Sequence, residues 1–110
     1  MEFDTGIDIK ELKCFVTVVE NKSFSRAAKQ LNLTQPTVSA HISALEQKLG
    51  VRLIVRAPKE SYASDAGKVY YHHVKDIFRL RQNAIEVLLH YSENTGSMSD
   101  GVHEHDLHHL

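Results

Sequence analysis

Cysteine is nearly absent from this sequence of 110 residues, and so are long apolar runs. The single cysteine, Cys14, excludes a disulfide within the chain and is compatible with a reducing compartment. No apolar run approaches the roughly 20 residues of a membrane-spanning helix, and the N-terminus shows no signal-peptide pattern. We therefore expect a cytoplasmic protein with no membrane partner.

The residues of catalytic sites are also missing. Cys14 falls within a predicted helix and has no nearby base in the sequence, so we interpret it as a packed thiol and not as a nucleophile. No metal, nucleophile or phosphate-loop constellation stands out elsewhere. We predict that the chain is not an enzyme and binds no cofactor.

The net charge of −1 conceals an uneven distribution. All 13 lysines and arginines fall between Lys10 and Arg81, and residues 10–90 hold seven of the 14 acidic residues. The net charge of residues 10–90, the body of the chain, is therefore 13 minus 7, or +6. A basic body is compatible with attraction to phosphates, although many solvated domains are equally basic. The length and the hydrophobic content of 42% support one domain with a modest core, or a small core completed by a partner.

The most informative stretch is Thr34 to Gly50, which we predict to be a helix with two different faces. The inward stripe follows steps of four, three and four: Val38, Ile42, Leu45 and Leu49. The opposite face is small, polar and uncharged: Pro36, Thr37, Ser39, Ala40, Ser43, Ala44 and Gln47. Thr34 is the expected N-cap and Gly50 the expected stop, and the N–H groups of the first turn are placed to meet a phosphate. A plain core helix is the alternative.

Two shorter helices precede this stretch. Ile9 to Asn21 has apolar residues at helical spacing, and Ser23 or Ser25 caps a second helix. The inward residues of the second helix are Phe24, Ala27, Ala28 and Leu31. Only a few residues connect it to Thr34, which is the spacing of a helix-turn-helix. The alternative is an ordinary helical hairpin.

Two short extended runs follow the helix that ends at Gly50. Val51 to Val55 and Ser61 to Ala63 flank the turn-forming residues 57–60 and predict a β-hairpin wing. Arg52, Arg56 and Lys59 make this wing basic. For each of these basic residues taken singly, a position in a solvated turn is almost as good an interpretation as a position in a basic wing.

The last predicted helix is capped by Ser64 and continues to about Tyr91, which makes it roughly 40 Å long. Its far half extends past the expected domain and needs a partner, for which a second copy is the economical choice. The candidate dimerisation residues lie on one stripe: Tyr70, Val74, Ile77, Phe78, Arg81, Ile85 and Leu88.

The two ends have a different character. We expect residues 1–8 to be flexible and residues 92–110 to be a disordered, His-rich tail. The tail gathers His103, His105, His108 and His109 near two acids, so a divalent metal is conceivable. Because the spacing matches no structural site that we can name, we assign no metal site.

Residues from Ile9 to about Leu89 resemble the N-terminal DNA-binding domain of LysR-type transcriptional regulators, a winged helix-turn-helix followed by a linker helix. The motifs that carry the resemblance are SFSRAA, L-x-x-TQPTVS and I-x-x-LE-x-x-LG-x-x-L, in order and without gaps. The resemblance implies groove-facing roles for Gln35, Pro36, Thr37 and Ser39, and makes Arg56 the wing arginine. The sequence departs from the family pattern at Ala40, His41, Ile54 and Ala63.

The predicted fold is mainly α: a winged helix-turn-helix over residues 9–63 with a short two-stranded β wing, then a long C-terminal dimerisation helix over residues 64–91. The predicted function is sequence-specific binding of double-stranded DNA as a homodimer, in the regulation of transcription. The alternative is an interaction module that pairs with full-length relatives and antagonises them. The family's effector-binding domain has no counterpart here, so we expect no small-molecule effector. The candidate DNA-binding residues are Arg26, Thr34, Gln35, Pro36, Thr37, Ser39, Ala40, His41, Arg56 and Lys59.

Overall fold

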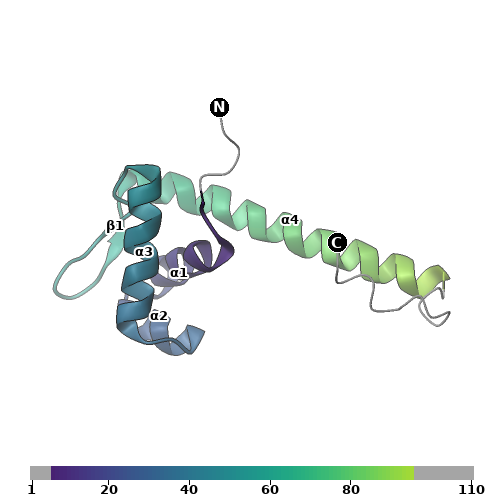
Figure 1. Ribbon diagram of the computed structural model, residues 1–110, viewed down its shortest axis with the longest axis horizontal. Coiled ribbons are helices and arrows are strands. Elements are labelled where there is room, and N and C mark those ends of the chain that lie inside the picture. The colour runs from purple at the N-terminus through teal and green to yellow at the C-terminus, as the bar shows by residue number, and fades with distance from the viewer. Residues whose placement is uncertain (1–5, 96–110) are drawn as a thin grey trace. The chain divides into compact units, whose positions relative to one another are not determined.

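The computed structural model describes residues 6–95, which form four helices and one two-stranded sheet (Figure 1). The elements in chain order are α1 (Ile9–Asn21), α2 (Phe24–Leu31), α3 (Gln35–Leu49), β1 (Ile54–Val55), β2 (Tyr62–Ala63) and α4 (Asp65–Thr95). The mainly helical fold predicted from the sequence is confirmed. The chain divides into two compact units, Met1–Lys75 and Asp76–Leu110, which are described separately.

Helix α1 begins with a capping box. The Asp8 side chain accepts a hydrogen bond from the Glu11 N–H at 3.0 Å, and the Glu11 carboxylate accepts one from the Asp8 N–H at 3.3 Å. The Glu11 N–H lowers the pKa of the Asp8 carboxyl because it stabilises the charged form. Asp8, the last residue of the segment predicted to be flexible, is therefore the N-cap of α1. Residues 1–5 lie outside the described residues.

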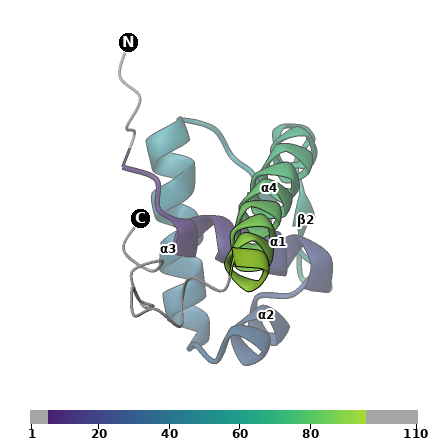
Figure 2. The same ribbon diagram turned by 90° about the vertical axis from the view of Figure 1, so that its right-hand side faces the viewer.

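Helices α2 and α3 are bounded by caps and left-handed stops. Ser23, rather than Ser25, is the N-cap of α2, and its hydroxyl accepts a hydrogen bond from the Arg26 N–H. Asn32, at φ 61°, ends α2, and Gly50, at φ 70°, ends α3. The short connection between the two helices confirms the predicted helix-turn-helix. In Figure 2 both helices lie beside α1.

The core of the first unit lies between α1, α2 and α3. Six side chains of these three helices have no exposed surface: Phe15, Val18, Ala27, Val38, Ile42 and Leu45. Two predicted core residues, Leu31 and Leu49, are only half-buried. The central stripe of each helix was therefore predicted correctly, and the departures are at helix ends, where fewer neighbours surround a side chain.

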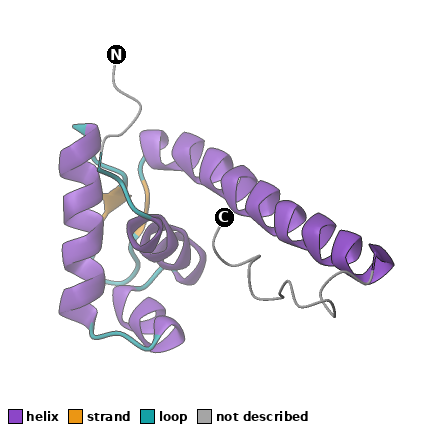
Figure 3. Ribbon diagram, turned by 45° about the vertical axis from the view of Figure 1, so that its right-hand side comes forward, coloured by secondary structure: helices purple, strands orange, loops and turns teal. Residues whose placement is uncertain are grey.

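The wing is a minimal antiparallel pair, in which Ile54 faces Ala63 and Val55 faces Tyr62 (Figure 3). It is shorter than predicted because the Leu53 N–H bonds to a side chain of α3 instead of to the facing strand. Its N–H donates to Glu46 Oε2 of α3 at 2.8 Å, and its carbonyl accepts from the Ser64 N–H at 2.9 Å. The Ile54 N–H donates to the same Glu46 oxygen at 3.0 Å. The two bonds to Glu46 fix the base of the wing to α3.

Helix α4 starts where predicted and ends later. The Ser64 hydroxyl accepts from the Gly67 N–H at 3.0 Å and caps the first turn. The helix continues to Thr95, past the predicted end at Tyr91, because the first glycine after Tyr91 is Gly96. Residues 92–95 are thus part of α4 in the structure. The remainder of the predicted tail, with its histidines, lies outside the described residues.

The first turns of α4 pack within the first unit. The Tyr70 ring lies 5.6 Å from the Phe15 ring, and Val74 is completely buried. Val74 is therefore a core residue, and its prediction as a dimerisation residue is wrong, since it retains no surface for a partner. No helix within residues 6–95 is both long and apolar enough to cross a membrane.

Candidate nucleic-acid interface

The outer face of α3 is exposed and carries no charged side chain. Pro36, Ala40, Ser43 and Gln47 follow steps of four, three and four, so they line the face opposite the buried stripe. Gln35 and Thr37 are exposed beside this line at the first turn. Such a face presents only short side chains and amides, which allows a close approach to a groove of duplex DNA.

The predicted anion site at the start of α3 is smaller than expected. Thr34 Oγ1 accepts a hydrogen bond from the Thr37 N–H at 3.2 Å, and the two hydroxyls lie 2.8 Å apart. Pro36 has no N–H to donate. Among the first-turn residues that the structure describes, the Gln35 N–H is thus the donor left for a phosphate. Thr34 acts mainly as the cap of α3.

Arg56 connects the wing to α3 and α2. Its Nη1 donates a hydrogen bond to Ser39 Oγ at 2.8 Å, and its Cζ lies 4.2 Å from the centroid of the Phe24 ring. Arg56 remains exposed, whereas Ser39 is half-buried. A guanidinium has five N–H donors, so the bond to Ser39 leaves most of them available to another partner.

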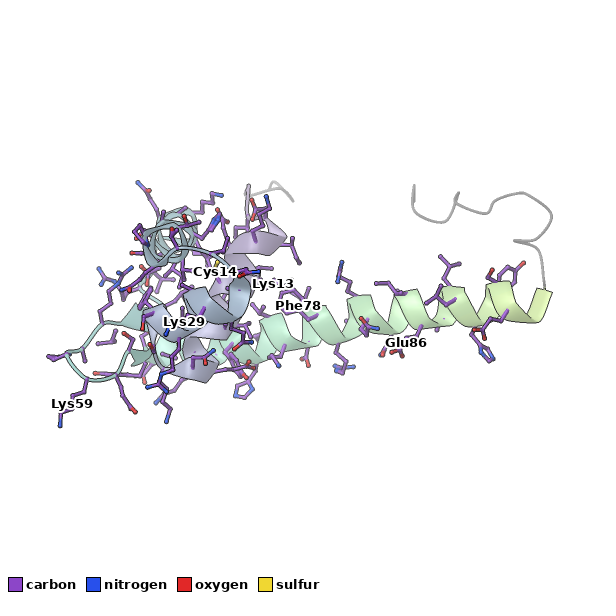
Figure 4. The ribbon with its side chains drawn as sticks, turned by 90° about the horizontal axis from the view of Figure 1, so that it is seen from below. Lys13, Cys14, Lys29, Lys59, Phe78 and Glu86 are labelled. Carbon is purple, nitrogen blue, oxygen red and sulfur yellow. The ribbon has the colours of Figure 1, made fainter. Side chains whose placement is uncertain are left out.

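A polar cleft of about 400 Å³ lies next to Arg56, among the start of α2, the start of α3 and the wing. The residues that line it are Lys22, Ser23, Phe24, Ser25, Gln35, Arg56, Ala57, Pro58, Lys59 and Ser61. Three of these residues are positively charged, and others supply hydroxyl and amide groups. Figure 4 shows Lys59 projecting from the wing loop. This combination of groups suits a sugar-phosphate backbone.

The remaining predicted residues lie apart from this cleft. Arg26 is exposed on α2, and Ala40 is on the outer face of α3. His41 is half-buried on the flank of α3, not on its outer face. The structure therefore brings Gln35, Arg56 and Lys59 together around one cleft, and Ser39 is bonded to Arg56.

Lys48 belongs to α3 but contributes neither to the outer face of this helix nor to the polar cleft. Its ammonium lies 2.6 Å from Glu11 Oε2 and 2.6 Å from the Gly6 carbonyl oxygen. The Glu11 side chain is 6% exposed. Because a buried carboxylate without its partner is costly, Lys48 remains paired with α1.

Some residues of the interface were not among the candidate DNA-binding residues. Ser43 and Gln47 were predicted on the outward face of this helix but were not named as DNA-binding, and in the structure they continue the outer line of α3. Lys22 and Ser25 line the cleft, although nothing in the sequence places them beside the wing. Phe24 was expected only as a core residue, and no sequence signal links it to an arginine 32 positions later.

The second unit presents apolar surface along α4. Leu80, Val87 and Tyr91 are each at least 60% exposed, and they line one side of the helix together with Asn83, Ala84 and Leu88. Of the predicted dimerisation residues, Ile77, Arg81 and Ile85 are exposed, whereas Phe78 and Leu88 are half-buried. Leu80 and Val87 were missed, although Leu80 follows Ile77 at a helical step of three.

Comparisons with known proteins agree with this geometry. The family model described as "Bacterial regulatory helix-turn-helix protein, lysR family" matches residues 9–68. The HTH-type transcriptional regulator CysL of Bacillus subtilis (strain 168) is 35% identical over 88 residues, which cover 79% of this chain and 29% of CysL. The chain thus spans less than a third of the length of that relative.

Solved structures with the same fold include two DNA complexes. The BenM_DBD/benA site 1 DNA complex matches with a TM-score of 0.74 and 27% identity, over 77% of this chain and 96% of that one. The CbnR_DBD-DNA complex matches with a TM-score of 0.73 and 27% identity, over 77% of this chain and 98% of that one. The family model covers more than half of this chain, and the fold agrees with these domains over most of their length. The chain therefore belongs to the lysR family of bacterial regulatory helix-turn-helix proteins.

Proposed function

We propose that this chain binds double-stranded DNA sequence-specifically, as a dimer, and thereby regulates transcription. The observation that carries the proposal is the exposed, uncharged outer face of α3 directly beside Arg56. The two structurally similar domains named above, BenM_DBD and CbnR_DBD, were both solved with DNA, which supports the same use of this surface.

In this proposal α3 enters the major groove and the wing follows the backbone. Gln35 has an amide that can pair with a base edge, in the way that glutamine reads adenine. Arg56 and Lys59 lie on the other side of the cleft, where contacts to phosphates or to the minor groove position the domain. Gln35 therefore reads bases, whereas Arg56 and Lys59 supply affinity.

The dimer is proposed to form through the second unit. Exposed leucine, valine and tyrosine side chains on one side of α4 cost free energy in water, and a second α4 would cover them. A two-fold pair of domains reads two half-sites of a palindromic operator. The alternative function, pairing with a longer relative to antagonise it, would use the same side of α4.

Two substitutions test the division of roles at the site. Gln35→Ala should relax the preference for particular base pairs, at a cost of about 1–3 kcal/mol on the preferred site for a lost bidentate contact. Arg56→Ala should weaken binding to preferred and random duplexes by similar factors. Binding of both variants is measured by fluorescence anisotropy on a duplex selected from a random pool and on a shuffled duplex.

The matched control is Gln82→Ala, which removes an exposed amide of α4 that bonds to Glu86 and lies far from α3 in sequence. It should leave both affinities unchanged. Equal losses on selected and shuffled DNA for Gln35→Ala would contradict the reading role. Failure of the unmodified chain to bind any duplex would leave pairing with a relative as the better function.

A further inference from the structure

Phe24 and Ser39 hold the wing arginine from two sides. The Arg56 guanidinium lies over the Phe24 ring, with 4.2 Å between Cζ and the ring centroid, and donates to Ser39 Oγ at 2.8 Å. Phe24 begins α2 and is 7% exposed, and Ser39 belongs to α3. A single side chain of the wing therefore contacts both helices of the helix-turn-helix.

These contacts restrict an otherwise mobile side chain. An arginine in a solvated loop samples many rotamers, and binding to DNA must order it at an entropic cost. The ring attracts the guanidinium through its quadrupole, and the serine hydroxyl fixes one N–H direction. The side chain is thus ordered before DNA arrives, with its other donors beside the polar cleft.

We propose that Phe24 is a positioning residue that pre-orders Arg56 for contact with the DNA backbone or minor groove. Ser39 is a second positioning residue, because its hydroxyl accepts a hydrogen bond from Arg56. This role differs from the groove-facing role that the family resemblance implies for Ser39. The wing then meets DNA in a fixed register with α3. This inference rests on the proposed DNA binding and extends it to a residue of the apolar core.

A double-mutant cycle on the selected duplex tests the role of the ring. Phe24→Leu removes the ring but keeps an apolar side chain, and it should weaken binding about twofold to fivefold, the effect of one cation–π contact at an exposed site. In an Arg56→Ala background the same substitution should have no further effect on affinity. Phe24→Tyr retains the ring and should restore the affinity of the unmodified chain.

The matched control is Phe15→Leu, which removes a buried ring that contacts Tyr70 and not Arg56. Its effect on affinity should be the same with and without Arg56. Equal losses for Phe24→Leu in the two backgrounds would overturn the proposal, because Phe24 would then act only through the fold. If Phe24→Leu does not fold, Ser39→Ala takes its place in the cycle, since it changes no core packing.

A measurement without DNA separates this inference from the proposed function. The ring current of Phe24 should shift the NMR signals of the Arg56 side chain, and Phe24→Leu should abolish that shift. Duplex binding without the shift refutes only the positioning role. A clear shift in a chain that binds no duplex refutes the proposed function, and the role of Phe24 in DNA binding with it.

Discussion

Replacing Gly67 by alanine should destabilise the protein, although alanine is the better helix former. Gly67 lies in the first turn of α4, where helix propensity alone predicts a gain of about 0.5–1 kcal/mol for alanine. A Cβ at this position would lie 2.1 Å from the Leu53 carbonyl oxygen and 3.2 Å from Ala63 Cβ. The chain must therefore move at the junction of the wing and α4.

The cost can be worked out from these contacts. Ordinary van der Waals contact begins near 3.4 Å, so the Leu53 carbonyl must retreat by more than 1 Å. That movement also disturbs its 2.9 Å hydrogen bond from the Ser64 N–H. Overpacking costs about 1–3 kcal/mol and a lost hydrogen bond about 0.5–1.5 kcal/mol, so a net destabilisation of about 0.5–4 kcal/mol remains after the propensity gain.

Urea and thermal unfolding, followed by circular dichroism at one fixed protein concentration, measure the effect. A change of this size lowers Tm by roughly 4–8 °C for each kcal/mol. The control is Lys68→Gly, an exposed position of the same helix, which should cost about 0.5–1 kcal/mol through propensity alone. An unchanged or raised stability for Gly67→Ala would refute the packing argument.

Two further predictions concern α4. Ile77→Glu and Leu88→Glu place a charge on the apolar surface and should convert the proposed dimer to a monomer in sedimentation equilibrium, whereas Arg79→Glu on the polar side should not. A dimer that persists in both variants would show that this apolar surface does not form the dimer contact. Glu20 Oε2 accepts hydrogen bonds from Tyr71 Oη at 2.6 Å and Lys75 Nζ at 2.9 Å; although burial acts in the opposite direction, these bonds lower its pKa. Its contribution to stability is therefore complete above the ordinary value of 4.5 and disappears as the pH falls through the lower folded-state pKa. Because the pair is largely exposed, Glu20→Gln should cost only about 0.2–1 kcal/mol at pH 7 and nothing in strong acid, and a gap in urea stability that persists in acid would contradict this assignment.

Local chemistry explains why much of the fold could be predicted. The caps Thr34 and Ser64 and the stop Gly50 act within a few residues of their own helix, so the sequence displays them directly. The bond between Lys48 and Glu11 and the placement of Arg56 over Phe24 join residues more than 30 positions apart. No local pattern encodes such pairs.

Periodicity also could not assign the faces of α4. The spacing that joins Val74 to Ile77 and Leu88 is continuous along the helix, yet Val74 packs into the core of the first unit. Leu80 and Val87 belong to a neighbouring, exposed face. A heptad pattern shows which residues are apolar, but it does not show which of them the same chain already covers.

The central claim, that α3 and the wing form a DNA-binding surface, is tested most directly by a salt titration. The unmodified chain is titrated onto a duplex recovered from a random pool and onto a shuffled duplex, at ionic strengths from low to physiological. We expect tighter binding to the recovered duplex and an affinity that falls steeply with salt, with a log–log slope of about −0.9 for each phosphate contacted. No binding to any duplex at low salt, or an affinity indifferent to both salt and sequence, would contradict it.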